Sequence, residues 1–482
     1  MACSVLIAKA ANGFEAPALT PLMRMKLITK PLSLCLCVSL AAVSVVKGAN
    51  TITDHRSFEM GRQQGARIVE AGPRATPARR FDFGPGAVAP GYQQVMPQSI
   101  YRRDTGFGFE RGAQITCVTR KGKDSLRNDF CTSDRPFYFS VALPEGNYNV
   151  TVTLGDAAGE SLTTIKAELR RLMVEKVETK PGKFETRTFV VNLRTPIIAG
   201  GGEVKLKDRE KTTEIWNWDE KLTLEFNNAN PKLCAIEIVP VNVPTIFLLG
   251  DSTVCDQPLE PYNSWGQMLT RFFRPGVAIA NHAESGESLR SSLGARRLDK
   301  VLSVMRPGDY LFIQYGHNDE KEKGEGVGAF TTYKADLKKF VDGARERGGI
   351  PVLITPVQRR SFDKDGKITN SHGDYPEAMR QVAKENNVPL IDLNAMSKPL
   401  YEAWGIEPSK RAFAPNDNTH HNNYGSYELA KCIVEGLRST KLGIVKYLVT
   451  DVSRFDPKHP DPLESFSVPP SPLHTEPKPP GR

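Results

Sequence analysis

A single change of pattern, close to residue 241, constrains the fold of this chain more than any other feature of its sequence. Before this point, short segments alternate apolar with polar residues between turns rich in Gly, Pro and Asn, as in FYFSVALPEGNYNVTVTL (137–154). After it, short continuous apolar runs are separated by longer segments with helical spacing. Alternation is typical of antiparallel strands with one buried face, whereas continuous runs between helices are typical of parallel strands covered on both faces. We therefore predict an all-β sandwich followed by an α/β domain.

The expected elements follow from these runs. In the first half we expect antiparallel strands at residues 137–143, 148–154, 189–193, 204–206, 221–226 and 235–239. In the second half we expect parallel strands at 245–249, 277–280, 310–314, 352–355 and 389–393, with helices at 330–347, 375–387 and 424–437. The predicted boundaries are 78–240 for the sandwich and 243–442 for the α/β domain. Residues 443–482 form a Pro-rich tail, whose composition predicts an extended, mobile end.

The N-terminal segment has the composition of an export signal. From Met25, two lysines precede an uncharged, mostly apolar run at 32–46, and small residues then precede a polar stretch, which is the order of a secretory signal peptide. The run has 15 residues, fewer than the ~20 that a membrane-spanning helix needs. We therefore assign 25–48 as a signal peptide, 1–24 as an upstream extension and 49–77 as a linker. The protein is predicted to be extracytoplasmic (periplasmic or secreted), with no membrane association once the signal is removed.

Charge and cysteine content exclude some classes of partner. The 64 Lys and Arg against 55 Asp and Glu give a net charge of +9, without the dense basic stripe that nucleic-acid binding needs. A mild positive balance instead favours an acidic partner. A Cys117–Cys131 disulfide would suit an oxidising compartment, but the sequence favours scattered, unpaired thiols. The cysteines beyond the signal segment match no zinc spacing; they are Cys117, Cys131, Cys234, Cys255 and Cys432.

Polar residues suited to acyl transfer follow the predicted strands of the α/β domain. The first strand is followed by GDST (250–253), the second by NHAESG (281–286) and the third by GHND (316–319), and the last connecting segment carries DNTH (417–420). Open parallel sheets bind ligands at the carboxyl ends of their strands. We therefore expect these four segments to meet at one edge of the sheet.

Within these segments, three residues form a candidate catalytic triad. Ser252 needs a contacting base to act as a nucleophile, His420 is the best candidate for that base, and Asp417 is placed to orient its imidazole. The backbone N–H groups of Ser252 and Gly286 and the side-chain amide of Asn318 are candidates for an oxyanion hole. Each residue alone also fits a simpler role, such as a helix N-cap or an Asx turn. The hypothesis therefore depends on all four segments occurring in order.

The four segments match the motif blocks of the SGNH (GDSL) hydrolases, and residues 243–442 resemble that family. The resemblance implies a flavodoxin-like α/β/α sandwich with a five-stranded parallel sheet, and ester hydrolysis through an acyl-enzyme without metal or cofactor. It implies that Ser252 is the nucleophile, His420 the base and Asp417 its orienting acid. It also implies that Ser252, Gly286 and Asn318 form the oxyanion hole. Cys255 departs from the family pattern, since Thr or another small residue is expected there.

Further segments resemble one branch of this family and a second domain that accompanies it. SWGQML (264–269) and NHAESGES (281–288) resemble the rhamnogalacturonan acetylesterase branch, and the half that begins at FDFG (81–84) is similar to the galactose-binding-like domain that precedes such esterases. The implied partner is an O-acetylated plant polysaccharide, with acetylated rhamnogalacturonan as the first choice. Its galacturonate units are acidic, so arginines near the site are candidate substrate contacts. They are Arg359 and Arg360 after the fourth strand, with Arg290, Arg296 and Arg297 also compatible; a solvated basic surface is the simpler explanation.

Three other functions remain as alternatives. An esterase or lipase of the same family could act on acetyl xylan or on an aryl or acyl ester. A lipase, thioesterase or arylesterase would favour a broad apolar acyl pocket, and the sequence around the site is polar and basic. A non-catalytic glycan-binding protein is a different class, and the intact triad argues against it. A metal-dependent deacetylase would need a ligand set such as His317, Asp319, Asp417 and His420. The sequence indicates no oligomeric state.

A few aromatic and imidazole side chains need separate assignments. Trp265 and Trp404 are candidates for stacking on a sugar ring, although core packing is the commoner role of a lone Trp. Trp216 and Trp218 would share one face of a strand if a strand runs there, and they then form either a binding platform or a packing surface. His421 adjoins His420, but the motif spacing predicts that His421 points elsewhere.

Overall fold

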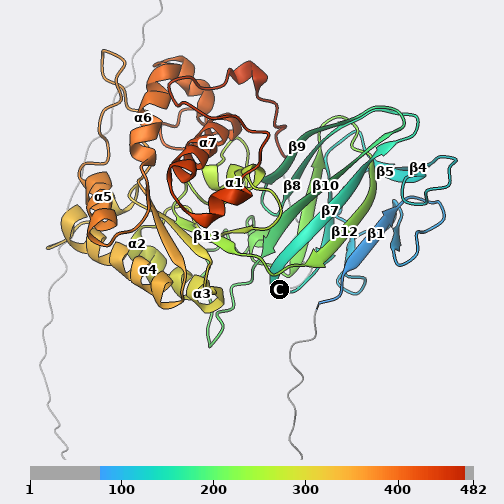
Figure 1. Cartoon of the computed structure of the whole chain (residues 1–482), viewed down its shortest axis with the longest axis horizontal. Helices are drawn as coiled ribbons and strands as arrows, with labels where there is room; N and C mark the ends of the chain where they lie inside the picture. The colour runs from blue at the N-terminus through green and yellow to red at the C-terminus, as the bar shows by residue number, and fades with distance from the viewer. Residues whose placement is uncertain (1–75, 473–482) are drawn as a thin grey trace, which may run out of the picture. The chain divides into compact units, whose positions relative to one another are not determined.

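The structure is a computed structural model, and it describes residues 76–472 (Figure 1). The predicted signal peptide (25–48), the extension before it, residues 49–75 of the predicted linker and residues 473–482 of the tail lie outside the described residues. Across 76–472, no helix combines the length and the apolar character needed to cross a membrane.

The first half of the described chain forms two β-sheets (Figure 1). One has the order β10-β7-β12-β1-β2, extended by β5 and β4, and the other has the order β3-β6-β11-β8-β9. Neighbouring described strands pair antiparallel, apart from the parallel pair β1–β2. The strands are β1 (Arg79–Phe83), β2 (Gln93–Val95), β3 (Phe107–Phe109), β4 (Thr116–Thr119), β5 (Asp129–Thr132), β6 (Phe137–Ala142), β7 (Gly146–Asp156), β8 (Ser161–Ala167), β9 (Arg171–Thr179), β10 (Lys183–Leu193), β11 (Lys221–Asn227) and β12 (Leu233–Pro240).

An apolar core lies between these two sheets. It joins Phe81, Val152 and Ile236 of the first sheet with Phe139 and Leu224 of the second, and all of these side chains are fully buried. One buried face per sheet is what the alternating sequence pattern requires. The prediction of a β-sandwich is therefore confirmed.

One predicted strand in this half is wrong, and no strand runs through Trp216 and Trp218. Residues 204–206 form no strand, and Trp216 lies on a 3-10 turn (Ile215–Asn217) rather than a strand, with Trp218 directly after it. The strands that the sequence analysis did not predict include β8 and β9. Both strands carry buried charged side chains, Lys166 and Arg171, which interrupt the apolar alternation that identifies a strand.

The sequence favoured unpaired cysteines, and the structure corrects this for one pair. Cys117 and Cys131 form a disulfide. They stand opposite each other in the register of β4 with β5, a cross-strand placement that brings their Cβ atoms within bonding reach. Cys234, Cys255 and Cys432 are buried thiols.

The second half is built on a five-stranded parallel sheet with the order β14-β13-β15-β16-β17. Alternate residues of β13 face opposite layers: Ile246 and Leu248 pack with α1, α6 and α7, whereas Phe247 and Leu249 pack with α2, α3, α4 and α5. The predicted α/β/α sandwich is confirmed, and each predicted strand overlaps an observed one. The elements are β13 (Thr245–Gly250), α1 (Trp265–Leu269), β14 (Ala278–Asn281), α2 (Leu289–Gly294), α3 (Arg297–Val304), β15 (Tyr310–Gln314), α4 (Lys334–Glu346), β16 (Ile350–Ile354), α5 (Tyr375–Glu385), β17 (Leu390–Ile391), α6 (Leu393–Trp404) and α7 (Asn423–Ser439).

The strand predicted at 389–393 is shorter than expected. It contains only Leu390 and Ile391, because Asp392 accepts a hydrogen bond from the backbone N–H of Ala395 and so begins α6. An Asp at this position is a strong N-cap.

The described part of the tail is extended, as predicted, but it is fixed to the rest of the protein. Phe455 and Val468 are buried in the core of the α/β half. The Nζ of Lys166 donates to the carbonyl of Pro469 and to the Oγ of Ser471, both at 2.7 Å. The prediction of mobility therefore does not hold for residues 451–472, because their contacts are with residues distant in sequence.

A buried ion pair joins the two halves. The Nε of Arg171 in β9 lies 2.7 Å from Asp256, which follows β13. Both side chains are almost fully buried. Nearby, Gln267 and Thr270 donate to the carbonyls of Leu169 and Leu172 at 2.8 and 2.7 Å. The turn between β8 and β9 is therefore docked directly against the segment that follows β13.

We expect Arg171→Met to lower the free energy of unfolding by about 3–5 kcal/mol, because it leaves the Asp256 carboxylate buried without its partner. Arg187→Met is the matched control, since Arg187 forms an exposed ion pair with Glu185, a kind of pair that contributes about 0–1 kcal/mol. Urea titration of both variants measures the difference. Equal midpoints for the two variants would show that the buried pair adds nothing.

Candidate active site

Ser252 lies in the tight turn that follows β13. The backbone N–H groups of Val254 and Cys255 both donate to the carbonyl of Asp251 at 3.0 Å. The turn starts at Gly250, where a Cβ atom would lie 2.7 Å from the carbonyl oxygen of Gln314 and 2.6 Å from Val254. Glycine is therefore required for β13 and β15 to approach each other at this point.

The buried carboxylate of Asp251 organises this turn. One of its oxygens accepts hydrogen bonds from the backbone and hydroxyl of Thr253, and the other lies 3.2 Å from Nδ1 of His317. Burial acts to raise the pKa of Asp251, but His317 and Thr253 outweigh it and hold that pKa below its usual value. Burial also lowers the pKa of His317. We therefore assign a neutral His317 that donates its Nδ1 proton to an ionised Asp251.

The structure brings the predicted triad residues together. The Nε2 of His420 lies 2.8 Å from Oγ of Ser252, and its Nδ1 lies 2.8 Å from the Asp417 carboxylate. Asp417 also accepts the backbone N–H groups of Thr419 and His420 at 2.7 and 2.9 Å. Burial opposes ionisation, but these hydrogen bonds keep the pKa of Asp417 below its usual value. This arrangement can remove a proton from the serine hydroxyl and stabilise the resulting imidazolium.

An open cavity of about 650 Å³ lies against Ser252. The three oxyanion-hole candidates, Ser252, Gly286 and Asn318, all line it. Within the described residues, the backbone N–H groups of Ser252 and Gly286 donate no hydrogen bond. The amide nitrogen of Asn318 donates to the carbonyl of Glu287 at 3.0 Å, which leaves its second proton available. The other lining residues are Gln257, Tyr262, Ser285, His317, Glu320, Lys321, Arg359, Thr419 and His420.

The two arginines predicted to contact substrate lie in different surroundings. Arg359 lines the cavity and forms an ion pair with Glu320. Arg360 does not line the cavity; its guanidinium donates to Ser409, Asn418 and the carbonyl of Ile406 at 2.7–2.9 Å. Arg360 therefore braces the loop that carries the triad histidine.

Other side chains singled out in the sequence have structural contacts. His421 is buried and lies 2.6 Å from the hydroxyl of Tyr401, away from Ser252 as predicted; burial lowers its pKa to about 3. The alternative metal ligands do not gather: His317 contacts Asp251, and Asp319 accepts the backbone N–H of Leu289.

The tryptophans and one of the arginines are also accounted for by packing. Trp265, Trp216 and Trp218 are buried, and Trp404 stacks on Tyr401, so none of the four lines the cavity. Arg297 is fully buried and forms an ion pair with Glu210, so it is not part of a basic surface.

Sequence reasoning missed several residues of the cavity. Gln257 donates to the carbonyl of Ser252 at 2.7 Å, and the ring of Tyr262 packs edge-on against His420. Neither has a sequence signal beyond its closeness to Ser252. Glu320 and Lys321 directly follow GHND (316–319). Their position after the third predicted strand of the α/β domain could have identified them as candidate cavity residues.

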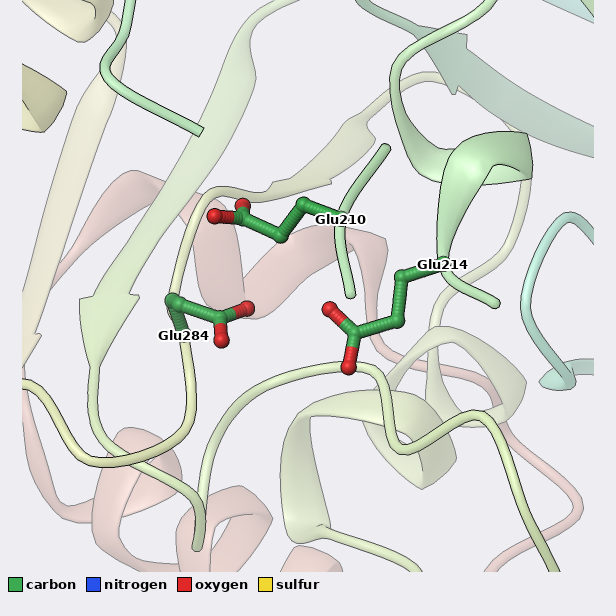
Figure 2. Close-up of side chains that lie close together, drawn as sticks. All are labelled: Glu210, Glu214 and Glu284. Carbon is green, nitrogen blue, oxygen red and sulfur yellow. The ribbon is translucent and has the colours of Figure 1, made fainter. Parts of the chain in front are cut away.

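A cluster of buried carboxylates (Figure 2) includes Glu284, which directly precedes Ser285 in the chain. Within 76–472, Glu210, Glu214 and Glu284 have carboxylate oxygens within 4.8 Å of one another. Each already has a cationic partner: Arg297 lies 2.7 Å from Glu210, and Arg209 contacts both Glu214 and Glu284. Carboxylates neutralised by guanidinium groups are a poor donor set for a metal ion. Burial and the neighbouring Glu284 instead raise the pKa of Glu214 to about 8.

This raised pKa predicts a specific pH dependence. Between pH 4.5 and 8 the folded protein retains a proton on Glu214 that the unfolded chain releases, so its stability falls as pH rises. Glu214→Gln keeps a neutral hydrogen-bonding side chain and removes this loss. We expect the Tm difference, Glu214→Gln minus parent protein, to be more positive at pH 8 than at pH 5. Glu346→Gln, at an exposed position of α4, is the control. The same offset at both pH values would contradict a protonated Glu214.

Comparison with known proteins finds two families in the chain. Residues 248–426 match the GDSL-like lipase/acylhydrolase family, and residues 79–175 match the beta-agarase/YXIM esterase-like, galactose-binding domain-like family. The first match contains Ser252, Gly286, Asn318, Asp417 and His420.

The curated relatives match different lengths of the chain. The chain is 43% identical over 220 residues to rhamnogalacturonan acetylesterase RhgT of Bacillus subtilis (strain 168), covering 42% of this chain and 94% of the relative. It is 27% identical over 370 residues to the uncharacterized esterase YxiM of the same organism, covering 74% of this chain and 90% of the relative. The crystal structure of YxiM aligns with a TM-score of 0.40 and 26% identity, covering 75% of this chain and 98% of that one. The chain therefore belongs to the GDSL-like lipase/acylhydrolase (SGNH hydrolase) family and is a carboxylic ester hydrolase.

Proposed function

We propose that this protein is a serine esterase that removes O-acetyl groups from a plant cell-wall polysaccharide, with acetylated rhamnogalacturonan as the first substrate to test. The observation that carries the proposal is the Ser252–His420–Asp417 hydrogen-bond series, with both contacts at 2.8 Å, beside an open cavity. The 43% identity to a rhamnogalacturonan acetylesterase supports the substrate class.

The reaction follows from the positions of these groups. Oγ of Ser252 attacks the acetyl carbonyl while Nε2 of His420 accepts its proton, and Asp417 stabilises the imidazolium. The oxyanion of the tetrahedral intermediate accepts hydrogen bonds from the N–H groups of Ser252 and Gly286 and from Asn318. Collapse of the intermediate breaks the ester C–O bond, and the departing sugar oxygen takes the proton from His420 and becomes a hydroxyl. Water then attacks the acetyl-enzyme by the same steps and releases acetate, so no step uses a metal or cofactor.

The polarity of the cavity supports an acidic, carbohydrate-like substrate. Most of its lining residues carry polar or charged side chains, and Lys321 and Arg359 supply cationic groups. Arg359 is already paired with Glu320, whereas Lys321 is exposed and its Nζ lies 3.1 Å from Oδ1 of Asn318. Lys321 is therefore the better candidate to contact the carboxylate of a galacturonate unit.

An extracytoplasmic location agrees with this function, since a plant polymer lies outside the cell. The signal-like pattern of residues 25–48 supports export. The Cys117–Cys131 disulfide supports it independently, because disulfides persist mainly in oxidising compartments.

Replacing the nucleophile tests the mechanism. We expect Ser252→Ala to keep the parent Tm and to lower kcat by at least about 10⁴-fold, because acyl-enzyme formation is lost. Ser439→Ala, at the end of α7, is the control and should retain full activity. Acetate release from acetylated rhamnogalacturonan is the readout. Parent-like turnover by Ser252→Ala would contradict the mechanism.

Comparing substrates tests the proposed specificity. We expect faster acetate release from acetylated rhamnogalacturonan than from acetylated xylan or an aryl acetate. Lys321→Gln should raise KM for the acidic polymer by about fivefold, since one ion pair near a surface contributes about 1 kcal/mol, and it should change KM for the neutral aryl acetate much less. Release from the aryl acetate alone would retain the serine mechanism and exclude the pectin assignment.

A further inference from the structure

Two cationic side chains from the β-rich half contact the oxyanion-hole loop of the α/β half. Lys207 and Arg209 lie between β10 and β11, outside both segments that match a family. The Nζ of Lys207 donates to the carbonyl oxygen of Ser285 at 2.7 Å, and the guanidinium of Arg209 donates to the same oxygen. One carbonyl therefore accepts two charged donors.

The Ser285 carbonyl and the Gly286 N–H belong to the same peptide group. In a trans peptide these two groups point in opposite directions, so fixing the oxygen also fixes the direction of the N–H. Gly286 has φ +77°, a left-handed conformation that favours glycine. It lines the cavity with Ser252. The two cations therefore hold the Gly286 N–H pointing away from themselves.

Carboxylates on either side of this peptide hold the cations in place. Nζ of Lys207 lies 2.7 Å from Glu287, and Nε of Arg209 donates to Glu284 at 2.6 Å. Both carboxylates are buried, and Figure 2 shows Glu284 facing Glu210 and Glu214. Ion pairs of this kind limit the movement of both cations. Charge-assisted hydrogen bonds are about twice as strong as neutral ones, and they polarise the groups to which they are linked.

We propose that Lys207 and Arg209 are positioning residues of the oxyanion hole. By holding and polarising the Ser285–Gly286 peptide, they make the Gly286 N–H a better-aligned and stronger donor to the oxyanion. Neither residue needs to touch the substrate. The inference rests on the proposed function, since an oxyanion forms only if Ser252 attacks an ester.

The test compares Lys207→Met, Arg209→Met and the double variant on a neutral aryl acetate. Active sites are titrated with an organophosphate, so that rates refer to folded enzyme. We expect kcat to fall about tenfold in each single variant and about 100-fold in the double variant, with KM changed less than about threefold. The reason is that the hydrogen bond from the Gly286 N–H to the oxyanion, which the substitutions weaken, forms only in the transition state. A phenylboronic acid, which forms a tetrahedral adduct with the serine, should lose affinity in parallel.

Two further variants separate this role from general effects. Lys211→Met makes the same charge change at an exposed position of the same segment, and it should retain the parent kcat. Lys207→Arg keeps a cationic donor, and it should restore most of the rate that Lys207→Met loses.

An unchanged kcat in the double variant would overturn the inference. So would a loss seen only as a raised KM for the acidic polymer, because the cations would then act on substrate charge. If the double variant is unfolded at the assay temperature, an unchanged kcat in Lys207→Met decides against the inference, since Lys207 is partly exposed. Failure of the proposed function itself would appear differently, as no turnover by the parent enzyme or as full turnover by Ser252→Ala.

Discussion

The active-site half depends on one buried carboxylate, that of Asp251. It lies at the end of β13, is fully buried, and receives hydrogen bonds from Thr253 in its own turn and from His317 after β15. A buried carboxylate is tolerated only when its hydrogen bonds are satisfied, so the turn must take the shape that supplies them. That shape directs Ser252 toward His420. In GDST (250–253), the aspartate therefore sets the geometry of the turn that presents the candidate nucleophile Ser252.

The motifs of the α/β half were predictable because local rules determine them. A continuous apolar run followed by GDST (250–253) or GHND (316–319) identifies a strand end, and parallel strands bring such ends to one edge. The contact of Ser252 with His420 follows from the same topology, although 168 residues separate them. The shape of the cavity does not follow from it, because residues such as Tyr262 enter from irregular segments.

The contacts that the β-rich half makes with the α/β half and with the tail were not predictable in this way. Lys207 and Arg209 lie in a segment with no strand or motif pattern, and their role depends on how that segment packs against the loop after β14. Arg171 and Lys166 even obscured the strands that contain them, because a charge within an alternating run indicates an exposed face. In this protein those charges are buried against Asp256 and the tail. In the local sequence pattern, side chains that connect distant parts of a chain therefore cannot be distinguished from ordinary polar surface residues.

The fixed tail has a consequence for motion. Between residues 76 and 472 the polypeptide passes from the β-rich half to the α/β half between β12 and β13, and the segment after α7 returns to Lys166 and Asn227. Two bodies joined by one linker can swing about it, and such relative motion is the usual expectation for neighbouring domains. Two separate connections between the halves restrict that rotation. When a contact between the halves breaks, the second connection keeps its partners at high effective concentration, so the contact re-forms quickly.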